Sequence, residues 1–510
     1  MDLSSSRKLI TLIRPAAMVR KFSLSNVLTP PIGIAYLAGT LLKNNIDCKI
    51  IDATGEALKK FTYLEYAGGF AVGLTNQEIV DRIDPKTDII GLSCMFSSSW
   101  TNDSRLIDLI RSRFPNAKIV LGGEHVTACC DYILQNHPAV DFCVKGEGEQ
   151  TLLELIHALR NQIEPSGVAG VVRRDPQGAI IHNNTRKRIV DINHIPKPAW
   201  HLVPLENYLS NLIGHGISNQ RSMPFLASRG CPYQCTFCSS AQMWTTRWIA
   251  RDVKEVVDEM EEYIHTYQVK NFDFYDLTAI IRKDWLIAFA QEVIRRNLQI
   301  TYQLPSGTRS EAIDKEVAEW LKKSGCTHVN YAPESGSKRT LKRIKKKVDL
   351  DNLLESLKYV CDQDIKVMCN IILFPHESPW DVLQTFRLMF KMARIGLHDI
   401  TFVPFVPYPG TELYEELKLE KKIPEFSEEH FKSLLIHSDL LEANSYNPYF
   451  GPKAVVAIRL LFLTSFYATS LLLRPQRIYF LIKNIITNDP QTRGEGGLRF
   501  LFQKILRLSH

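Results

Sequence analysis

The stretch Ser228-Arg229-Gly230-Cys231-Pro232-Tyr233-Gln234-Cys235-Thr236-Phe237-Cys238 carries three cysteines at spacings of four and three residues. Three thiolates this close in sequence can hold three corners of a cube-shaped iron–sulfur cluster. The fourth iron then has no protein ligand and stays open to a substrate or a cosubstrate. An open iron predicts chemistry rather than electron storage alone, so Cys231, Cys235 and Cys238 are the candidate metal ligands.

Two plainer uses of cysteine compete with this interpretation. Structural zinc takes four Cys or His ligands, usually in two pairs, and the chain has no second Cys-x2-Cys or His-x3-His pair. Disulfides are disfavoured because the N-terminal residues show no secretory signal and the 11 cysteines are scattered over 510 residues. We therefore expect a cytoplasmic protein with an iron–sulfur cluster.

Size and charge suggest several globular domains and a distinct tail. A chain of 510 residues with 45% hydrophobic and 23% charged residues has the length of about three domains. The net charge is +7, and from Pro452 onward there are nine basic and two acidic residues. The whole excess of positive charge therefore lies in the C-terminal region.

The N-terminal third alternates short apolar runs with helical patterns. The runs at 9–13, 48–51, 89–94, 118–121 and 142–144 are typical of buried strands, and 33–42, 104–114 and 149–160 are typical of helices. This alternation predicts an α/β domain with a doubly wound parallel sheet over residues 1–195. Ligands of such sheets bind beyond the carboxyl ends of the strands. The residues there that we expect to contact a cofactor are Thr54, Gly55, Ser93, Gly122, Gly123, Glu124, Gly146 and Glu147.

The middle of the chain predicts a second α/β unit. After a Pro-containing linker at 196–220, six strand–helix units occupy residues 221–425, and a helical region, 426–510, follows. Six units are too few for an ordinary eight-unit barrel. The predicted strands are 225–228, 271–275, 300–304, 327–331, 366–374 and 399–406, and the cysteines directly follow the first of them.

The Cys-x3-Cys-x2-Cys pattern, with Pro232 after the first cysteine and Phe237 before the third, resembles the signature of the radical S-adenosylmethionine (radical SAM) enzymes. Residues 30–38, the Gly122-Gly123 pair and residues 145–149 together resemble the cobalamin-binding domain that precedes many radical SAM domains. The resemblance implies a Rossmann-like cobalamin-binding domain, a partial (β/α)6 barrel and a helical C-terminal region. A sheet of this fold that has lost cobalamin is the alternative.

The resemblance has one departure. Better-known cobalamin carriers place a histidine, the lower ligand of cobalt, in an Asp-x-His-x-x-Gly motif, whereas this chain reads Asp52-Ala53-Thr54-Gly55. If cobalamin binds, its cobalt is therefore expected to lack a histidine from the protein.

The resemblance also implies a binding site for S-adenosylmethionine at the barrel rim. Glu334, in Tyr331-Ala332-Pro333-Glu334-Ser335-Gly336, matches a family glutamate that holds this cosubstrate, and Ser306 and Arg309 lie in a similar loop. A helix-capping turn is the alternative for Glu334.

The activity implied is reductive cleavage of S-adenosylmethionine by a [4Fe-4S] cluster that an external low-potential donor reduces. The radical formed would functionalise an unactivated carbon, and with cobalamin the usual outcome is C-methylation, here of an apolar small molecule or lipid. No catalytic side chain is expected beyond the cluster ligands. The alternatives are a non-methylating cyclase or rearrangement enzyme, and a cobalamin-binding sensor with a vestigial barrel.

Two further segments bear on partners. Residues 338–347 contain seven basic side chains, but a solvated helix and turn is favoured over nucleic-acid binding. In the tail, residues 454–473 are long and apolar enough to span a membrane, although a helix buried in a protein core has the same sequence pattern. Residues 498–508 have the pattern of a basic amphipathic helix. We expect peripheral membrane contact through this tail, with ordinary core packing as the alternative.

Overall fold

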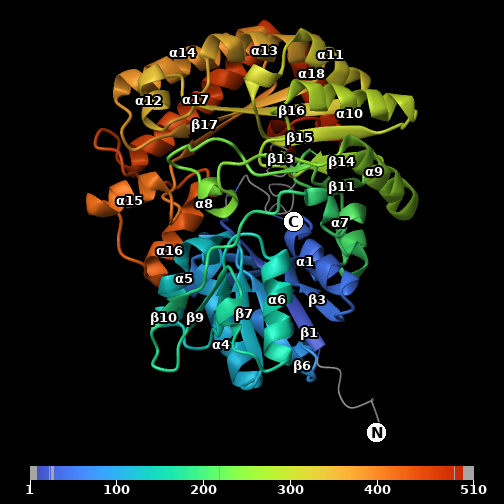
Figure 1. Cartoon of the computed structure of the whole chain (residues 1–510). Helices are drawn as coiled ribbons and strands as arrows, with labels where there is room; N and C mark the ends of the chain where they lie inside the picture. Colours follow the sequence, from blue (N-terminus) through green and yellow to red (C-terminus); the bar gives the residue numbers. More distant parts are fainter. Residues whose placement is uncertain (1–8, 22, 24–27, 218, 488, 498–510) are drawn as a thin grey trace.

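The computed structural model describes residues 9–497 except 22, 24–27, 218 and 488 (Figure 1). One large sheet forms in the N-terminal part of the chain and a second in the middle part, and the cysteine loop follows the first strand of the second sheet. In Figure 1 the blue and teal N-terminal sheet lies below the green-to-orange barrel.

The N-terminal sheet has seven strands in the order β10-β9-β8-β7-β6-β1-β3. The five strands from β8 to β3 run parallel, and β9 and β10 are antiparallel additions at one edge. Parallel strands are buried on both faces, which is why these segments are nearly continuous apolar runs. The doubly wound sheet is therefore confirmed. The strands are β1 (Leu9–Arg14), β3 (Cys48–Asp52), β6 (Thr87–Ser93), β7 (Lys118–Gly122), β8 (Phe142–Val144), β9 (Val171–Arg174) and β10 (Ile180–His182).

Helices cover both faces of this sheet. The helices α1 (Ile32–Lys43) and α6 (Glu149–Arg160) bury their apolar sides on one face. On the other face lie α3 (Asn76–Arg82), α4 (Trp100–Arg113) and α5 (Glu124–Asn136). A short α2 (Ala53–Glu56) follows β3, and a small sheet of β2 (Ala17–Val19), β5 (Gly69–Val72) and β4 (Phe61–Leu64) lies beside it.

The segment predicted as a linker is packed. Residues 196–220 contain α7 (Leu205–Ser210), and Trp200, Leu205 and Leu209 are buried in the core of the barrel. The Ala199 amide also donates a hydrogen bond to the Ala35 carbonyl of α1 at 2.8 Å.

The second sheet has six parallel strands in the order β11-β14-β15-β16-β17-β18, which confirms the partial barrel. The first strand lies three residues earlier than predicted, because Ser228–Arg229 forms a separate strand β12 that pairs with β13 (Ile249–Ala250). The barrel strands are β11 (Ser222–Phe225), β14 (Asn271–Phe274), β15 (Thr301–Thr308), β16 (Cys326–Glu334), β17 (Lys366–Leu373) and β18 (Asp399–Pro404).

The outer helices of the barrel bury one apolar side each against these strands. Local sequence fixes their starts: at α14, Ser378 and Asp381 form a capping box and Pro379 occupies the first turn. The helices of this unit are α8 (Ser240–Trp244), α9 (Val253–Tyr267), α10 (Lys283–Arg295), α11 (Lys315–Lys323), α12 (Lys338–Arg343), α13 (Leu350–Asp362) and α14 (Pro379–Ile395).

The C-terminal region is distributed over both units. The helix α16 (Glu428–Leu434) packs against α4 of the N-terminal unit, across the predicted boundary at residue 425, whereas α17 (Pro452–Leu473) packs on α14 and β18. Residues 491–494 cover the amino ends of barrel strands, where the Gly494 amide donates to Asp399 Oδ2 at 2.8 Å. The remaining helices are α15 (Glu412–Leu419) and α18 (Gln476–Ile486). The amphipathic helix predicted at 498–508 lies outside the described residues.

Candidate active site

The three cysteines lie in one loop between β12 and α8, and their thiols interact electrostatically with one another. The Cys238 amide donates to the Cys235 carbonyl at 3.1 Å. Between them, Thr236 bonds through its backbone to Ile344 and Leu413, and the Phe237 ring lies 5.2 Å from the Phe374 ring. Barrel-rim segments therefore hold this loop in place.

The spacing of the three sulfur atoms suits a cluster better than a single ion. Among the described residues, only Cys130, Asp131 and His182 bring three ligand atoms within 4.8 Å of one another, so at least one pair of the loop sulfurs lies farther apart than this. Two thiolates at about 2.3 Å from one zinc ion are at most about 4.6 Å apart. In a cluster each thiolate binds its own iron. Burial raises the pKa of Cys238 to about 12, so iron coordination is what would make this sulfur a thiolate.

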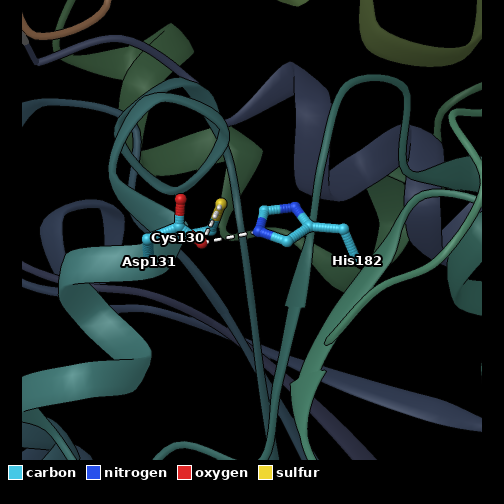
Figure 2. A group of neighbouring side chains, drawn as sticks. All are labelled: Cys130, Asp131 and His182. Atoms are coloured by element: carbon cyan, nitrogen blue, oxygen red, sulfur yellow. Dashed lines mark hydrogen bonds and ion pairs between the residues drawn. The ribbon is translucent and has the colours of Figure 1, made fainter. Parts of the chain in front are cut away.

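The Cys130 group lies elsewhere, on α5 and β10 (Figure 2). His182 Nε2 is 2.6 Å from Asp131 Oδ1, and both side chains are exposed beside a buried Cys130 thiol. The arrangement is that of a surface ion pair, which satisfies both groups without a metal ion.

A cavity of about 490 Å³ lies between the carboxyl edge of the N-terminal sheet and the barrel rim. Ser228, Arg229 and Gly230, which lead into the cysteine loop, line its barrel side, together with Leu226, Tyr275 and Leu277. The sheet side includes most of the positions expected from the sequence. These are Ser93, Gly122, Gly123, Glu124, Gly146 and Glu147. The cavity thus places these sheet positions opposite the residues that lead into the cysteine loop, whereas Cys231, Cys235, Cys238, Ser306, Arg309 and Glu334 are not among the residues that line it.

Part of the sheet side of this cavity is backbone exposed at glycines. A Cβ added to Gly122 would meet nothing within 4 Å, so this residue leaves open space in the cavity. The neighbouring Gly123 has φ +114°, and a Cβ there would approach the Cys94 carbonyl oxygen to 2.6 Å. None of the described residues that line the cavity is a histidine. This surface fits a flat macrocycle whose metal takes no histidine from the protein.

The structure does not bring Thr54 and Gly55 to the cavity. Thr54 Oγ1 accepts a hydrogen bond from the Ala17 amide at 3.0 Å, and the Gly55 amide donates to Asp52 Oδ1 at 3.1 Å. A Cβ on Gly55 would lie 2.6 Å from the Tyr208 ring. The physical reason is the packed connector, because α7 covers the carboxyl end of β3.

The two carboxylates predicted to contact a cofactor, Glu147 and Glu124, also contact residues that flank the cysteines. Glu147 and Glu149 pair with Arg229, and Glu124 accepts a hydrogen bond from Ser239, the residue after Cys238. Sequence reasoning missed Arg229, Ser239 and Glu149, although Ser239 directly follows Cys238 and only Gly230 separates Arg229 from Cys231.

The cosubstrate side is built around Glu334. This buried residue has φ +67°, a backbone region that non-glycine residues rarely adopt, and its Oε1 lies 2.9 Å from Lys346 Nζ. Burial alone would lower the pKa of Lys346, but the Glu334 carboxylate raises it above its ordinary value. The Arg309 guanidinium lies 3.9 Å from the centre of the Tyr233 ring in the cysteine loop. Glu334, Lys346 and Arg309 all interact electrostatically with Cys235.

Two observations complete this side. Ser306 lies where the pairing of β15 with β16 is irregular, between Leu304 and Gly307. Lys346 was missed because it belongs to the basic run 338–347, in which Arg343 and Lys345 pair with exposed carboxylates and the exposed Arg339 pairs with the buried Asp381.

Family models match the same two units. The model described as the radical SAM superfamily matches residues 225–389, and the model described as the B12 binding domain matches residues 25–156. The chain therefore belongs to the radical SAM enzymes that carry a cobalamin-binding domain. The exact domain boundaries stay predictions.

Individual relatives cover most of the chain. An uncharacterized methyltransferase of Pyrococcus horikoshii is 29% identical over 391 residues, which are 76% of this chain and 78% of that protein. An anaerobic magnesium-protoporphyrin IX monomethyl ester cyclase of Rubrivivax gelatinosus is 25% identical and covers 81% of this chain and 71% of its own. The structure of the radical S-adenosylmethionine methyltransferase TsrM from Kitasatospora setae, with cobalamin and a [4Fe-4S] cluster bound, has a TM-score of 0.61 at 16% identity, covering 81% of this chain and 78% of its own. It has the same fold.

Proposed function

We propose that the protein is a cobalamin-dependent radical SAM methyltransferase that adds a methyl group to an unactivated carbon of an apolar substrate. The observation that carries this proposal is the single cavity, in which the glycine-lined strand ends face the residues that lead into the cysteine loop. A cofactor site on the sheet that opens toward the cysteine loop would suit a reaction in which one cofactor activates the carbon and the other supplies the methyl group.

The residues have separate parts in this proposal. Cys231, Cys235 and Cys238 would hold the [4Fe-4S] cluster, with Glu334, Lys346, Arg309 and Ser306 around S-adenosylmethionine. Gly122, Gly123 and Gly146 would seat cobalamin, which would have no histidine below its cobalt. When bound, these groups supply a radical that removes a hydrogen atom and a transferable methyl group. The chain orients the reactants and excludes water, and an external low-potential donor would supply the electron.

The cavity wall supports an apolar substrate. Met95, Phe96 and Leu277 line it and keep 43%, 52% and 42% of their surface exposed. Large apolar side chains left open to a cavity favour an apolar ligand. A lipid or a similarly apolar small molecule is the substrate class we propose.

The test is a labelled methyl group. Anaerobically reconstituted enzyme, with cobalamin, a reductant and methyl-labelled S-adenosylmethionine, is incubated with a lipid extract of the source cells. We expect label in an extracted product, heavier by one methylene unit, together with 5′-deoxyadenosine and S-adenosylhomocysteine. Formation of 5′-deoxyadenosine without any transfer of label would overturn methylation.

A second candidate is a non-methylating cyclase or rearrangement enzyme. The observation that favours it is the cyclase relative, which covers 81% of this chain. In that case 5′-deoxyadenosine forms and the product gains no methylene. A cobalamin-binding sensor, the third alternative, would form neither 5′-deoxyadenosine nor a modified substrate, which distinguishes it from both kinds of enzyme.

We also propose that this cytoplasmic enzyme docks on an anionic membrane surface through α18 and the end of α17. The α17 helix is long and apolar enough to cross a membrane, but its Phe462 and Phe466 are buried in the barrel core. On α18, large apolar side chains are exposed instead. They are Ile478, Tyr479, Phe480, Ile482 and Ile486. Apolar side chains beside a region with an excess of basic residues suit anionic lipid.

Vesicle binding tests this docking. Wild-type protein should sediment with vesicles of phosphatidylglycerol and phosphatidylcholine, and less with phosphatidylcholine alone. The double variant F480S/I482S should lose this binding, whereas the control L419S, at a residue on α15 that is 85% exposed, should keep it. Equal vesicle binding by the double variant and wild type would contradict docking. Docking would also be contradicted if wild type were a dimer and the same double variant were a monomer, because the exposed face would then be a dimer interface.

A further inference from the structure

We propose that the loop holding the cluster cysteines is tied at both ends to the glycine loops of the cobalamin side, and that these two ties set the cobalt-to-cluster geometry. Arg229 with Glu147 and Glu149 forms the first tie, and Ser239 with Glu124 forms the second. This inference rests on the proposed function, since it assigns positioning residues to the same site.

The first tie joins the residue two positions before Cys231 to the Gly-Glu-Gly-Glu turn at 146–149. Arg229 Nη1 lies 3.2 Å from Glu147 Oε1, and Arg229 Nη2 lies 2.6 Å from Glu149 Oε1. All three side chains are buried. Glu147 also accepts from Arg188 Nε at 2.7 Å and from the Ile189 amide at 3.0 Å, so two cations face two carboxylates.

This charge group is rigid as well as balanced. The Arg229 guanidinium lies 5.0 Å from the centre of the Tyr36 ring and 5.8 Å from that of Trp244. Although burial opposes ionisation of Glu149, the Arg229 guanidinium lowers the pKa of this carboxyl. A two-pronged guanidinium between two carboxylates fixes direction as well as distance, which an ammonium cannot do.

The backbone between Arg229 and Cys231 is conformationally constrained. Gly230, the single residue between Arg229 and Cys231, has φ +89°, and a Cβ there would lie 2.2 Å from the Arg247 carbonyl oxygen. On the other side, Gly146 and Glu147 line the cavity. A shift of the turn at 146–149 is therefore passed to Cys231 through one ion-pair group and one fixed residue.

The second tie repeats this arrangement at the other end of the cysteine loop. Ser239 follows Cys238, and its hydroxyl donates to Glu124, the residue after Gly123. Glu124 begins α5 and lines the cavity. Each end of the loop thus contacts one of the two glycine segments that we propose seat cobalamin. The glycine motifs that resemble cofactor-binding segments therefore also hold the two domains in a fixed relative position.

The experiment compares R229K with wild type and with R251K. Lysine keeps the charge at 229 and loses the fork. Arg251 is the matched control, because it is a similarly buried arginine 2.6 Å from Glu259, but this pair lies within the barrel unit. Iron and cobalamin contents are measured first. Pulsed electron paramagnetic resonance then gives the distance distribution between the reduced cluster and the cobalt(II) of cobalamin.

We expect a narrow distribution in wild type and R251K and a broader or displaced one in R229K. We also expect R229K to form 5′-deoxyadenosine with at least about tenfold less methyl transfer per molecule, since small misplacements of reactants cost this much or more. If R229K fails to retain its cluster, S239A, which removes one hydroxyl, provides the same readings at the other tie. If both variants had the wild-type distance between cluster and cobalt and the wild-type ratio of methyl transfer to 5′-deoxyadenosine, the inference would be overturned. Wild type without cobalamin or 5′-deoxyadenosine would instead overturn the proposed function.

Discussion

Glu334 combines an unusual backbone with a buried charge. Its φ of +67° is unfavourable for a residue with a side chain, and its carboxylate depends on Lys346 for a counter-charge. Both groups act electrostatically on Cys235, so they lie near the loop that would hold the cluster. Removing one member of a buried pair leaves the other charge without compensation.

We therefore predict that K346M weakens the binding of S-adenosylmethionine at least about tenfold. The matched control is K345M, because the neighbouring Lys345 pairs with Glu412 at the surface. Equilibrium binding to reconstituted protein measures the effect, and thermal unfolding checks that both variants are folded. Equal affinity of K346M and K345M for S-adenosylmethionine would show that Lys346 does not contribute to the binding site.

Asp276 predicts a pH dependence of stability. It accepts hydrogen bonds from Ser228 and from the Ala227 amide, ahead of the cysteine loop, and burial raises its pKa from 3.8 to about 6. The native state thus binds this proton more tightly than the unfolded state does. The associated stability is fully present below pH 3.8 and is lost as the pH rises through about 6.

Asparagine cannot ionise, so D276N should lack this dependence. We expect the Tm of D276N minus that of wild type to increase between pH 5 and pH 7.5, measured by thermal unfolding at several pH values. Taking the difference cancels the titration of other groups. A constant or decreasing difference over this range would show that Asp276 does not ionise as described.

At the scale of elements, the ends of β6, β7 and β8 form the proposed cobalamin seat. Gly122 ends β7 and leaves open space in the cavity. We predict that G122V keeps the wild-type Tm, because valine suits a strand, and reduces cobalamin retention at least about tenfold. The control is G167V, at a glycine that also has nothing within 4 Å of an added Cβ. Full cobalamin retention by G122V would place the corrin elsewhere.

The sequence was sufficient for most elements, because short buried strands and amphipathic helices carry their own pattern. Prediction from the sequence was wrong where tertiary packing determines the structure. The first barrel strand ends at Phe225, because Ser228 and Arg229 pair with β13 instead of continuing it. Residues 196–220 seemed to be a linker, but Trp200 and Leu209 are buried against the barrel. Neither outcome can be inferred from local pattern alone.

At the scale of the molecule, the cysteine motif and the glycine loops predicted two cofactor sites, since each motif is contiguous in sequence. That the glycine loops would face the segment leading into the cysteine loop could be expected only through the family resemblance. The contacts between them could not be predicted, because Arg229 and Glu147 are distant in sequence. The same limit explains Thr54 and Gly55, which the motif placed at the site and the covering helix α7 removes from it.

In the proposed enzyme, the cavity at the carboxyl edge of the N-terminal sheet would bring cobalamin and a cluster with an open iron to the same substrate. The most direct measurement is product analysis of anaerobically reconstituted protein with cobalamin, S-adenosylmethionine and a low-potential reductant, beside a variant with Cys231, Cys235 and Cys238 replaced by alanine. The account predicts 5′-deoxyadenosine and S-adenosylhomocysteine from the wild type and no 5′-deoxyadenosine from the variant. Intact S-adenosylmethionine in the wild-type reaction, despite a full complement of iron and cobalamin, would contradict it.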